Sequence, residues 1–125
     1  MPKILLIVDD EEIVYKALSV QFTKDQLDIL TVDNGVDGLK TALEHHPDLI
    51  LLDILMPKMD GLTMLSKLRE DEWGKTAKVV VLSNLSDTEK VKEAMSFGSD
   101  EYLVKADWNV IDVASKIKNL LSLEK

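Results

Sequence analysis

The chain has 125 residues, of which 46% are hydrophobic and 30% charged, as is typical of one soluble globular domain. With 15 basic and 23 acidic residues, its net charge of -8 argues against nucleic-acid binding through a basic face. The absence of cysteine excludes disulfides and thiol chemistry. No signal-peptide core is present and no apolar stretch approaches the roughly 20 residues of a membrane span, so we expect a cytoplasmic protein.

Five short apolar runs predict β-strands. The first, third and fourth contain almost no polar alternation, which is typical of strands buried on both faces of a parallel sheet. The second alternates between apolar and polar side chains and predicts an edge strand. The third must end near Asp53, because Pro57 cannot continue a central strand. The runs are 4–8, 28–33, 49–52, 78–83 and 101–104.

Apolar residues at helical spacing follow each of these runs. The expected inward positions are Ile13, Val14, Ala17, Leu18 and Phe22; Val36, Leu39, Ala42 and Leu43; Leu62, Leu65 and Leu68; Val91, Ala94 and Met95; and Val110, Val113, Ala114, Ile117, Leu120 and Leu121. Asp9 or Asp10 is expected to cap the first helix, and residues 86–89 (SDTE) match a capping box for the fourth. Pro47 and Gly98 are expected to end the second and fourth helices.

Strands and helices therefore alternate strictly along the chain. This alternation predicts an α/β fold with a doubly wound five-stranded parallel sheet, right-handed crossovers and helices on both faces. No linker, repeat or low-complexity segment interrupts it, so we expect a single domain over residues 1–125.

Reactive side chains follow the carboxyl ends of four predicted strands. In a parallel sheet these ends meet at one edge, which is where open α/β sheets place their ligands. Three neighbouring carboxylates repel one another and favour a cation, and carboxylates with waters are the usual ligands of Mg²⁺. An Asp carboxylate is also a nucleophile towards phosphorus, for which a metal, an ammonium and a hydroxyl stabilise the phosphoryl oxygens. The side chains are Asp9 and Asp10, Asp53, Ser83 and Lys105.

Each of these residues also has a simpler interpretation. Asp9, Asp10 and Ser83 could cap helices, and Asp53 could simply end a strand and cap a turn. Lys105 could be a solvated lysine, and Tyr102 could be a half-buried strand aromatic. His45 and His46 are interpreted as solvated residues at a helix end rather than as a metal pair or phosphodonor. Trp73 and Trp108 are expected to cover the core.

These residues, taken together, resemble the receiver domain of two-component response regulators along the whole chain. The resemblance rests on Asp9-Asp10, on Asp53 followed by Met56-Pro57 and Asp60-Gly61, on Ser83, and on Tyr102 three residues before Lys105. It implies that Asp53 accepts a phosphoryl group from a histidine kinase, a histidine phosphotransfer protein of a phosphorelay, or a small phosphodonor.

The resemblance also implies the roles of the other residues. Asp10, Asp53 and the main-chain carbonyl of Leu55 would ligate Mg²⁺, with Asp9 acting through water. Ser83 and Lys105 would each bind a phosphoryl oxygen. Tyr102 would be a rotameric switch that turns inward once Ser83 moves. The resemblance gives the chain a signalling role rather than that of a dedicated enzyme.

Partners would read the switch on the face formed by the fourth helix, fifth strand and fifth helix. They would be a downstream protein or an effector domain that is not in the 125 residues, and we expect no direct contact with nucleic acid or membrane. The resemblance also allows homodimerisation on phosphorylation through the fourth and fifth helices, although no apolar stripe beyond the core faces requires it.

Four positions depart from the usual receiver pattern. Ala106 replaces a proline that usually follows the lysine through a cis bond, and we expect a trans bond because a cis bond before a non-proline residue costs about 3 kcal/mol. Asn84 replaces a small residue beside the switch hydroxyl. Leu55 and Leu85 offer no polar group to orient an attacking water, which predicts slow self-dephosphorylation.

Three other functions remain as alternatives. A Mg²⁺-dependent phosphohydrolase of the haloacid dehalogenase type would need a second aspartate two residues after Asp53, where the chain has Leu55. A flavodoxin-like binding protein would need a Gly- or Ser/Thr-rich phosphate loop after the first strand, where the chain has four acids. A degenerate receiver would only dock partners, and Ala106 and Asn84 keep that alternative open.

Overall fold

The structure is a computed structural model that describes residues 2–24 and 27–122. The strands are β1 (Lys3–Val8), β2 (Leu27–Val32), β3 (Leu49–Leu52), β4 (Val79–Ser83) and β5 (Glu101–Val104). The helices are α1 (Glu12–Val20), α2 (Gly35–His45), α3 (Gly61–Leu68), α4 (Thr88–Ser96) and α5 (Val110–Leu120). Two short 3₁₀ helices, η1 (Gly74–Thr76) and η2 (Lys105–Asp107), lie in loops. No helix in these ranges is long and apolar enough to cross a membrane.

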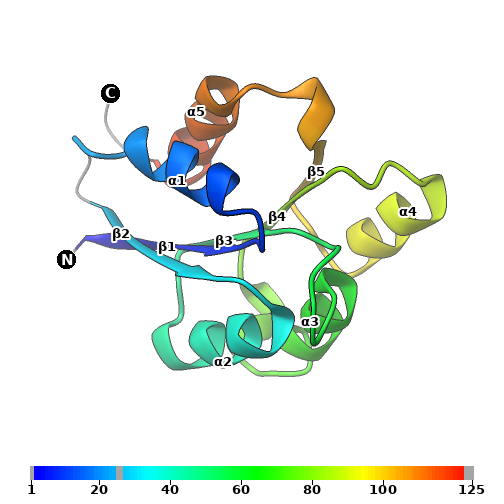
Figure 1. The fold of residues 1–125 in the computed structure, drawn as a ribbon. Helices are drawn as coiled ribbons and strands as arrows, with labels where there is room; N and C mark the ends of the chain where they lie inside the picture. The colour runs from blue at the N-terminus through cyan, green and yellow to red at the C-terminus, as the bar shows by residue number, and fades with distance from the viewer. Residues whose placement is uncertain (1, 25–26, 123–125) are drawn as a thin grey trace.

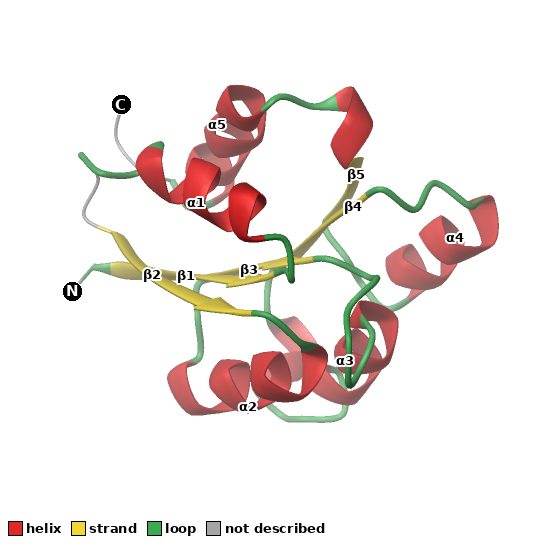
Figure 2. Ribbon diagram, in the orientation of Figure 1, coloured by secondary structure: helices red, strands yellow, loops and turns green. Residues whose placement is uncertain are grey.

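The five strands form one parallel sheet in the order β2-β1-β3-β4-β5. This is the doubly wound order that the alternation predicted, and β2 lies at an edge as expected. Helices α1 and α5 cover one face, and α2, α3 and α4 cover the other (Figures 1 and 2). The fold class inferred from the sequence is confirmed.

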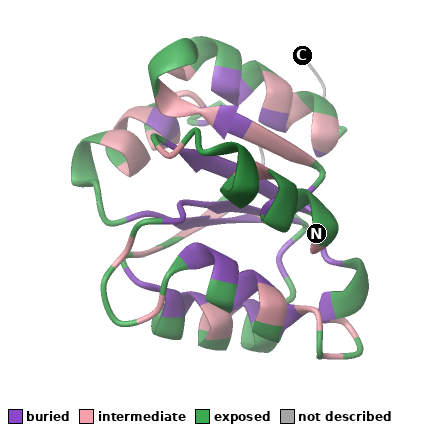
Figure 3. Cartoon of the chain, turned by 90° about the vertical axis from the view of Figure 1, so that its right-hand side faces the viewer, coloured by how far each residue is buried: buried purple, intermediate pink, exposed green. Residues whose placement is uncertain are grey.

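Alternate residues of the central strands point into two separate cores. Leu5 and Ile7 of β1 pack beneath α1 and α5, whereas Leu6 and Val8 pack against α2 and α3. All four residues of β3 are at most 2% exposed, which explains why its sequence has no polar alternation. Figure 3 shows the buried residues along the strands and on the helix faces turned towards them.

The inward faces of three helices differ in part from the expected ones. Val36 and Leu43 of α2 are 45% and 36% exposed, because the helix turns Gly35 and Gly38 inward instead. A Cβ at Gly38 would lie 2.9 Å from Val8 Cγ1, so the glycine permits close packing of α2 on β1. Ile13 of α1 and Met95 of α4 were also expected inside and are exposed.

Two capping predictions were wrong in position. The N-cap of α1 is Glu11, not an aspartate, and Asp9 instead accepts a hydrogen bond from the Glu11 amide before the helix begins. The N-cap of α4 is Asp87, whose side chain accepts from Glu89 N–H, so Ser86 does not form the expected capping box. Helices α2 and α4 end where predicted, with His46 and Gly98 in the left-handed region after them.

Candidate functional site

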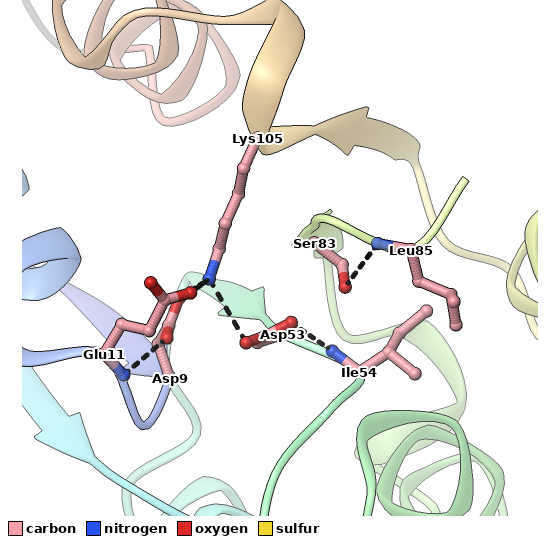
Figure 4. A network of polar contacts seen from close by, with 7 residues as sticks. All are labelled: Asp9, Glu11, Asp53, Ile54, Ser83, Leu85 and Lys105. Carbon is pink, nitrogen blue, oxygen red and sulfur yellow. Dashed lines mark hydrogen bonds and ion pairs between the residues drawn. The ribbon is translucent and has the colours of Figure 1, made fainter.

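The carboxyl edge of the sheet brings together side chains that are distant in the sequence. Asp9 follows β1 and Asp53 follows β3, while Ser83 is the last residue of β4 and Lys105 comes directly after β5. Because β1, β3, β4 and β5 are neighbours in the sheet, these ends lie side by side (Figure 4). The clustering that the sequence predicted for these four residues is present.

The ammonium of Lys105 is the centre of this cluster. Its Nζ lies 3.0 Å from Oδ2 of Asp9, 2.6 Å from Oε1 of Glu11 and 3.2 Å from Oδ2 of Asp53. The three acids surround the lysine from the loop after β1 and from the end of β3 (Figure 4). An ammonium has three donor hydrogens, and here it has three carboxylate partners.

Burial makes the charges of this cluster interact strongly. The side chains of Asp9 and Asp53 are 4% and 5% exposed, and that of Lys105 is 11% exposed. Desolvation raises the pKa of Asp9 to about 6, although hydrogen bonds from the Glu11 amide and Lys105 oppose the rise. Desolvation alone would lower the pKa of Lys105, but hydrogen bonds to Glu11 and Asp9 and the charge of Asp53 raise it overall.

The backbone around Asp53 fixes where its carboxylate points. The Asp53 amide donates to the Val8 carbonyl at 2.9 Å, and Oδ1 accepts from the Ile54 amide at 2.7 Å. The loop after β3 returns to the end of the strand, where the Gly61 N–H donates a hydrogen bond to the Ile54 carbonyl at 2.8 Å. A Cβ at position 61 would lie 2.1 Å from the Asp53 carbonyl oxygen, so only glycine fits there. Oδ2 is thereby left facing Lys105.

Three carboxylates of the cluster can hold a metal ion. Asp9, Asp10 and Asp53 each offer an oxygen, and these oxygens all lie within 4.8 Å of one another. Asp10 is exposed while the other two are buried, so the group opens to solvent on one side. This all-oxygen, acidic and partly open set fits a hard divalent cation that keeps some of its waters. The side chain of Leu55 is 57% exposed, and the role of its carbonyl stays a prediction.

Ser83 and Tyr102 meet the same loop residue. The fully buried Ser83 hydroxyl accepts a hydrogen bond from the Leu85 amide at 3.3 Å, and the Tyr102 hydroxyl donates to the Leu85 carbonyl. Desolvation, with the charges of Asp53 and Asp87, raises the pKa of the phenol and keeps it neutral. Asn84, between Ser83 and Leu85, is exposed. The two expected switch residues are therefore connected through one residue, Leu85.

The peptide bond after Lys105 has the trans geometry expected from the sequence. The described residues contain no cis peptide bond, so the bond between Lys105 and Ala106 is trans. Trp108 packs against the core beneath α1 and α5, with Lys116 Nζ 5.5 Å from the centre of its ring.

The two histidines take no part in this site. At the far end of the sheet, the His46 ring stacks on Trp73 with 4.3 Å between centroids, so His46 is more than a solvated helix end. Trp73 itself packs against the core beneath α2 and α3, as its sequence position suggested.

The sequence matches the family model for the response regulator receiver domain over residues 5–117. The chain belongs to the response regulator receiver domain family. This receiver domain is 30% identical over 117 residues to the response regulator ArlR of Staphylococcus aureus, covering 94% of the chain and 52% of the relative. The chain thus spans about half the length of the curated relatives it matches.

Solved structures show the same fold. A putative response regulator from Chloroflexus aurantiacus is 25% identical, with a TM-score of 0.84 and coverage of 98% of this chain and 99% of that one. A chain in the CheX–CheY–BeF₃–Mg²⁺ complex from Borrelia burgdorferi is 32% identical, with a TM-score of 0.84 and coverage of 96% and 90%.

One site residue of the receiver domain was not expected. Glu11 is one of the four acids after the first strand and was given no role at the site, yet it makes the shortest of the three contacts to Lys105. Its pairing joins residues 94 positions apart. The only sequence signal is that Glu11 follows the two aspartates in the same strand-end loop.

Proposed function

We propose that this receiver domain is a phosphorylation-dependent signalling switch in which Asp53 is the phosphoacceptor. The observation that carries the proposal is the pairing of the buried Asp53 carboxylate with Lys105 at 3.2 Å, at a strand end that also holds Asp9 and Asp10. A nucleophilic carboxylate, a fixed cation and a metal-binding acid pair are what phosphoryl transfer to an acid requires.

In the transfer step, a carboxylate oxygen of Asp53 forms a bond to phosphorus. The bond from phosphorus to the nitrogen of a phosphohistidine, or to the oxygen of a small acyl phosphate, breaks, and the leaving group keeps the electron pair. The hydrogen bond from the Ile54 amide to Oδ1 holds the carboxylate, so that Oδ2 is the free nucleophile once Lys105 shifts to the phosphoryl group.

Mg²⁺ is the metal we propose for Asp9, Asp10, Asp53 and the Leu55 carbonyl. When bound, it would neutralise charge on the phosphoryl oxygens and the acids. Lys105 and the Ser83 hydroxyl would stabilise the remaining oxygens, because both lie at the same edge as Asp53 (Figure 4).

The change in partner affinity would pass through Leu85. If Ser83 turns to a phosphoryl oxygen, its hydrogen bond with the Leu85 amide is lost and the loop from β4 to α4 is free to shift. Tyr102, whose hydroxyl donates a hydrogen bond to the Leu85 carbonyl, would then move with the loop. Phosphorylation would in this way bias a two-state equilibrium at the face formed by α4, β5 and α5.

The proposed donors are a histidine kinase or a histidine phosphotransfer protein, and the proposed location is the cytoplasm. The proposed reader of the α4–β5–α5 face is a downstream protein or an effector domain. Residues 1–125 would act as one domain, with no catalytic turnover beyond their own phosphorylation and dephosphorylation. A docking-only receiver is the alternative that the exposed Asn84 and the Ala106 loop leave open.

Intact-mass spectrometry after incubation with acetyl phosphate tests the proposal. The wild type should gain one phosphoryl group when Mg²⁺ is present and none when it is chelated. Asp53→Ala should gain none, while Asp107→Ala, which changes an exposed acid outside the cluster, should behave as the wild type. If no adduct forms from acetyl phosphate or from a phosphohistidine donor, the chain is a docking module instead.

A further inference from the structure

The Lys105 ammonium has three donor hydrogens and three carboxylate partners in this structure. Its three carboxylate partners, Asp9, Glu11 and Asp53, all lie within 3.2 Å of Nζ. When Oδ2 of Asp53 bonds to phosphorus, the ammonium must leave that oxygen and move to a phosphoryl oxygen, and its contacts with Asp9 and Glu11 oppose this move. The strength of these two contacts therefore affects how readily the site holds the phosphoryl group.

The two remaining partners differ in how easily they can leave. Asp9 is 4% exposed, and losing the cation would leave its charge unpaired in a buried setting. The Glu11 side chain is 45% exposed and can exchange Lys105 for water at little cost. Its main chain is held independently by the hydrogen bond from its amide to Asp9 Oδ1 at 2.9 Å, so the side chain can rotate away without moving the loop.

We propose that Glu11 is a positioning residue that occupies Lys105 until a phosphoryl group replaces it. Glu11 holds the ammonium beside Asp53 in the unphosphorylated protein and competes with the phosphoryl oxygens for it. The inference rests on the proposed function of Asp53 and adds a residue that sets how tightly the site holds a phosphoryl group.

Binding of beryllium fluoride, a mimic of the phosphoryl group, tests this competition. Bound fluoroberyllate is measured by ¹⁹F NMR at Mg²⁺ concentrations that saturate each variant. An exposed ion pair contributes up to about 1 kcal/mol, so Glu11→Gln should bind the mimic roughly fivefold more tightly than the wild type.

Three further variants distinguish the effect of losing the Glu11–Lys105 contact from the effect of removing a negative charge near the site. Glu12→Gln removes an adjacent charge that pairs with Lys16 rather than Lys105, and should leave the affinity unchanged. Glu11→Asp keeps the charge but shortens the side chain, and should behave as Glu11→Gln. In a Lys105→Gln background, Glu11→Gln should have no effect, because the competition acts through the lysine.

A second measurement uses the protein without metal or mimic. In a ¹H–¹⁵N correlation of lysine ammonium groups, the Lys105 signal should be protected from solvent exchange in the wild type and broadened in Glu11→Gln. Glu12→Gln should keep the wild-type signal.

The outcomes distinguish this inference from the function on which it rests. Equal affinity of the wild type and Glu11→Gln for the mimic, or an equal gain in Glu12→Gln, overturns the role of Glu11 and leaves the switch intact. Failure of the wild type to bind the mimic, with Asp53→Ala no different, overturns both.

Discussion

The hydroxyl of Tyr102 donates a hydrogen bond to the main-chain carbonyl of Leu85. This contact links β5 to the loop that leads from β4 into α4, and the amide of the same Leu85 donates to the Ser83 hydroxyl. The loop is thus held at one residue, by Ser83 at the end of β4 and by Tyr102 of β5.

Replacing Tyr102 with phenylalanine tests this link. Tyr102→Phe leaves the Leu85 carbonyl without its donor while keeping the ring packed beside α4, so the free energy of unfolding should fall by about 1 kcal/mol. Urea unfolding measures the change. Tyr15→Phe is the matched control, because the Tyr15 hydroxyl makes no hydrogen bond within the described residues. An equal loss in both variants would show that the Leu85 contact contributes nothing.

The raised pKa of Asp9 predicts how stability depends on pH. Folding raises this pKa from 3.8 to about 6, so between these values the folded protein binds more protons than the unfolded chain, and its stability falls as the pH rises. Asp9→Asn should therefore raise the free energy of unfolding at pH 7 without metal by about 1–2 kcal/mol, a value discounted for screening by solvent. The gain should disappear below pH 4.

Urea unfolding between pH 4 and pH 8 measures this profile. Asp28→Asn, which changes an exposed residue of the edge strand, should leave the profile unchanged. A gain for Asp9→Asn that stays constant across this range would contradict the desolvation of Asp9.

Magnesium should relieve the repulsion among the acids and stabilise the fold. A ligand that binds only the folded state adds about 2.7 kcal/mol at a hundredfold excess over its Kd. Mg²⁺ should therefore raise the midpoint temperature of thermal unfolding of the wild type. It should not raise that of Asp10→Asn, which lacks an exposed carboxylate of the acid group. Asp107→Asn should shift as the wild type does. If Mg²⁺ still raised the midpoint temperature of Asp10→Asn, the metal would bind at another site.

The phosphorylated domain should lose its phosphoryl group slowly. Leu55, two residues after Asp53, presents a 57% exposed apolar side chain that cannot orient a water. Leu55→Asn should speed hydrolysis by roughly an order of magnitude, since positioning the attacking water lowers the barrier, and Leu55→Met should not. The decay of the adduct followed by mass spectrometry tests this. A wild-type lifetime of seconds, unchanged in Leu55→Asn and Leu85→Glu, would be the opposite result.

The sheet and its reactive edge could be predicted because each strand, and the reactive residue that follows it, can be recognised from one short stretch of sequence. Apolar runs such as β3 mark buried parallel strands, and an aspartate or lysine directly after such a run must lie at the carboxyl edge. The inward face of α2 was misassigned for a related reason. The spacing of hydrophobic residues predicted that Val36 and Leu43 face inward, but both are exposed. The helix packs closely on β1 through Gly38, which a hydrophobic pattern does not detect because glycine has no apolar side chain.

Contacts between segments could not be predicted in the same way. The pairing of Glu11 with Lys105 depends on where two loops project beyond the sheet, and neither loop has a periodic pattern. The N-cap of α4 was assigned one residue too early because Ser86 and Asp87 are both good capping residues, and only the backbone angles decide between them.

The central claim, that Asp53 accepts the phosphoryl group, is tested most directly by locating the modified residue. Borohydride reduces an aspartyl phosphate to homoserine, which peptide mass spectrometry assigns to a position. After incubation with acetyl phosphate and Mg²⁺, the expected result is homoserine at position 53 alone, and none in Asp53→Asn. Homoserine at Asp9, Asp10 or another acid in the wild type, with position 53 unmodified, would contradict the claim.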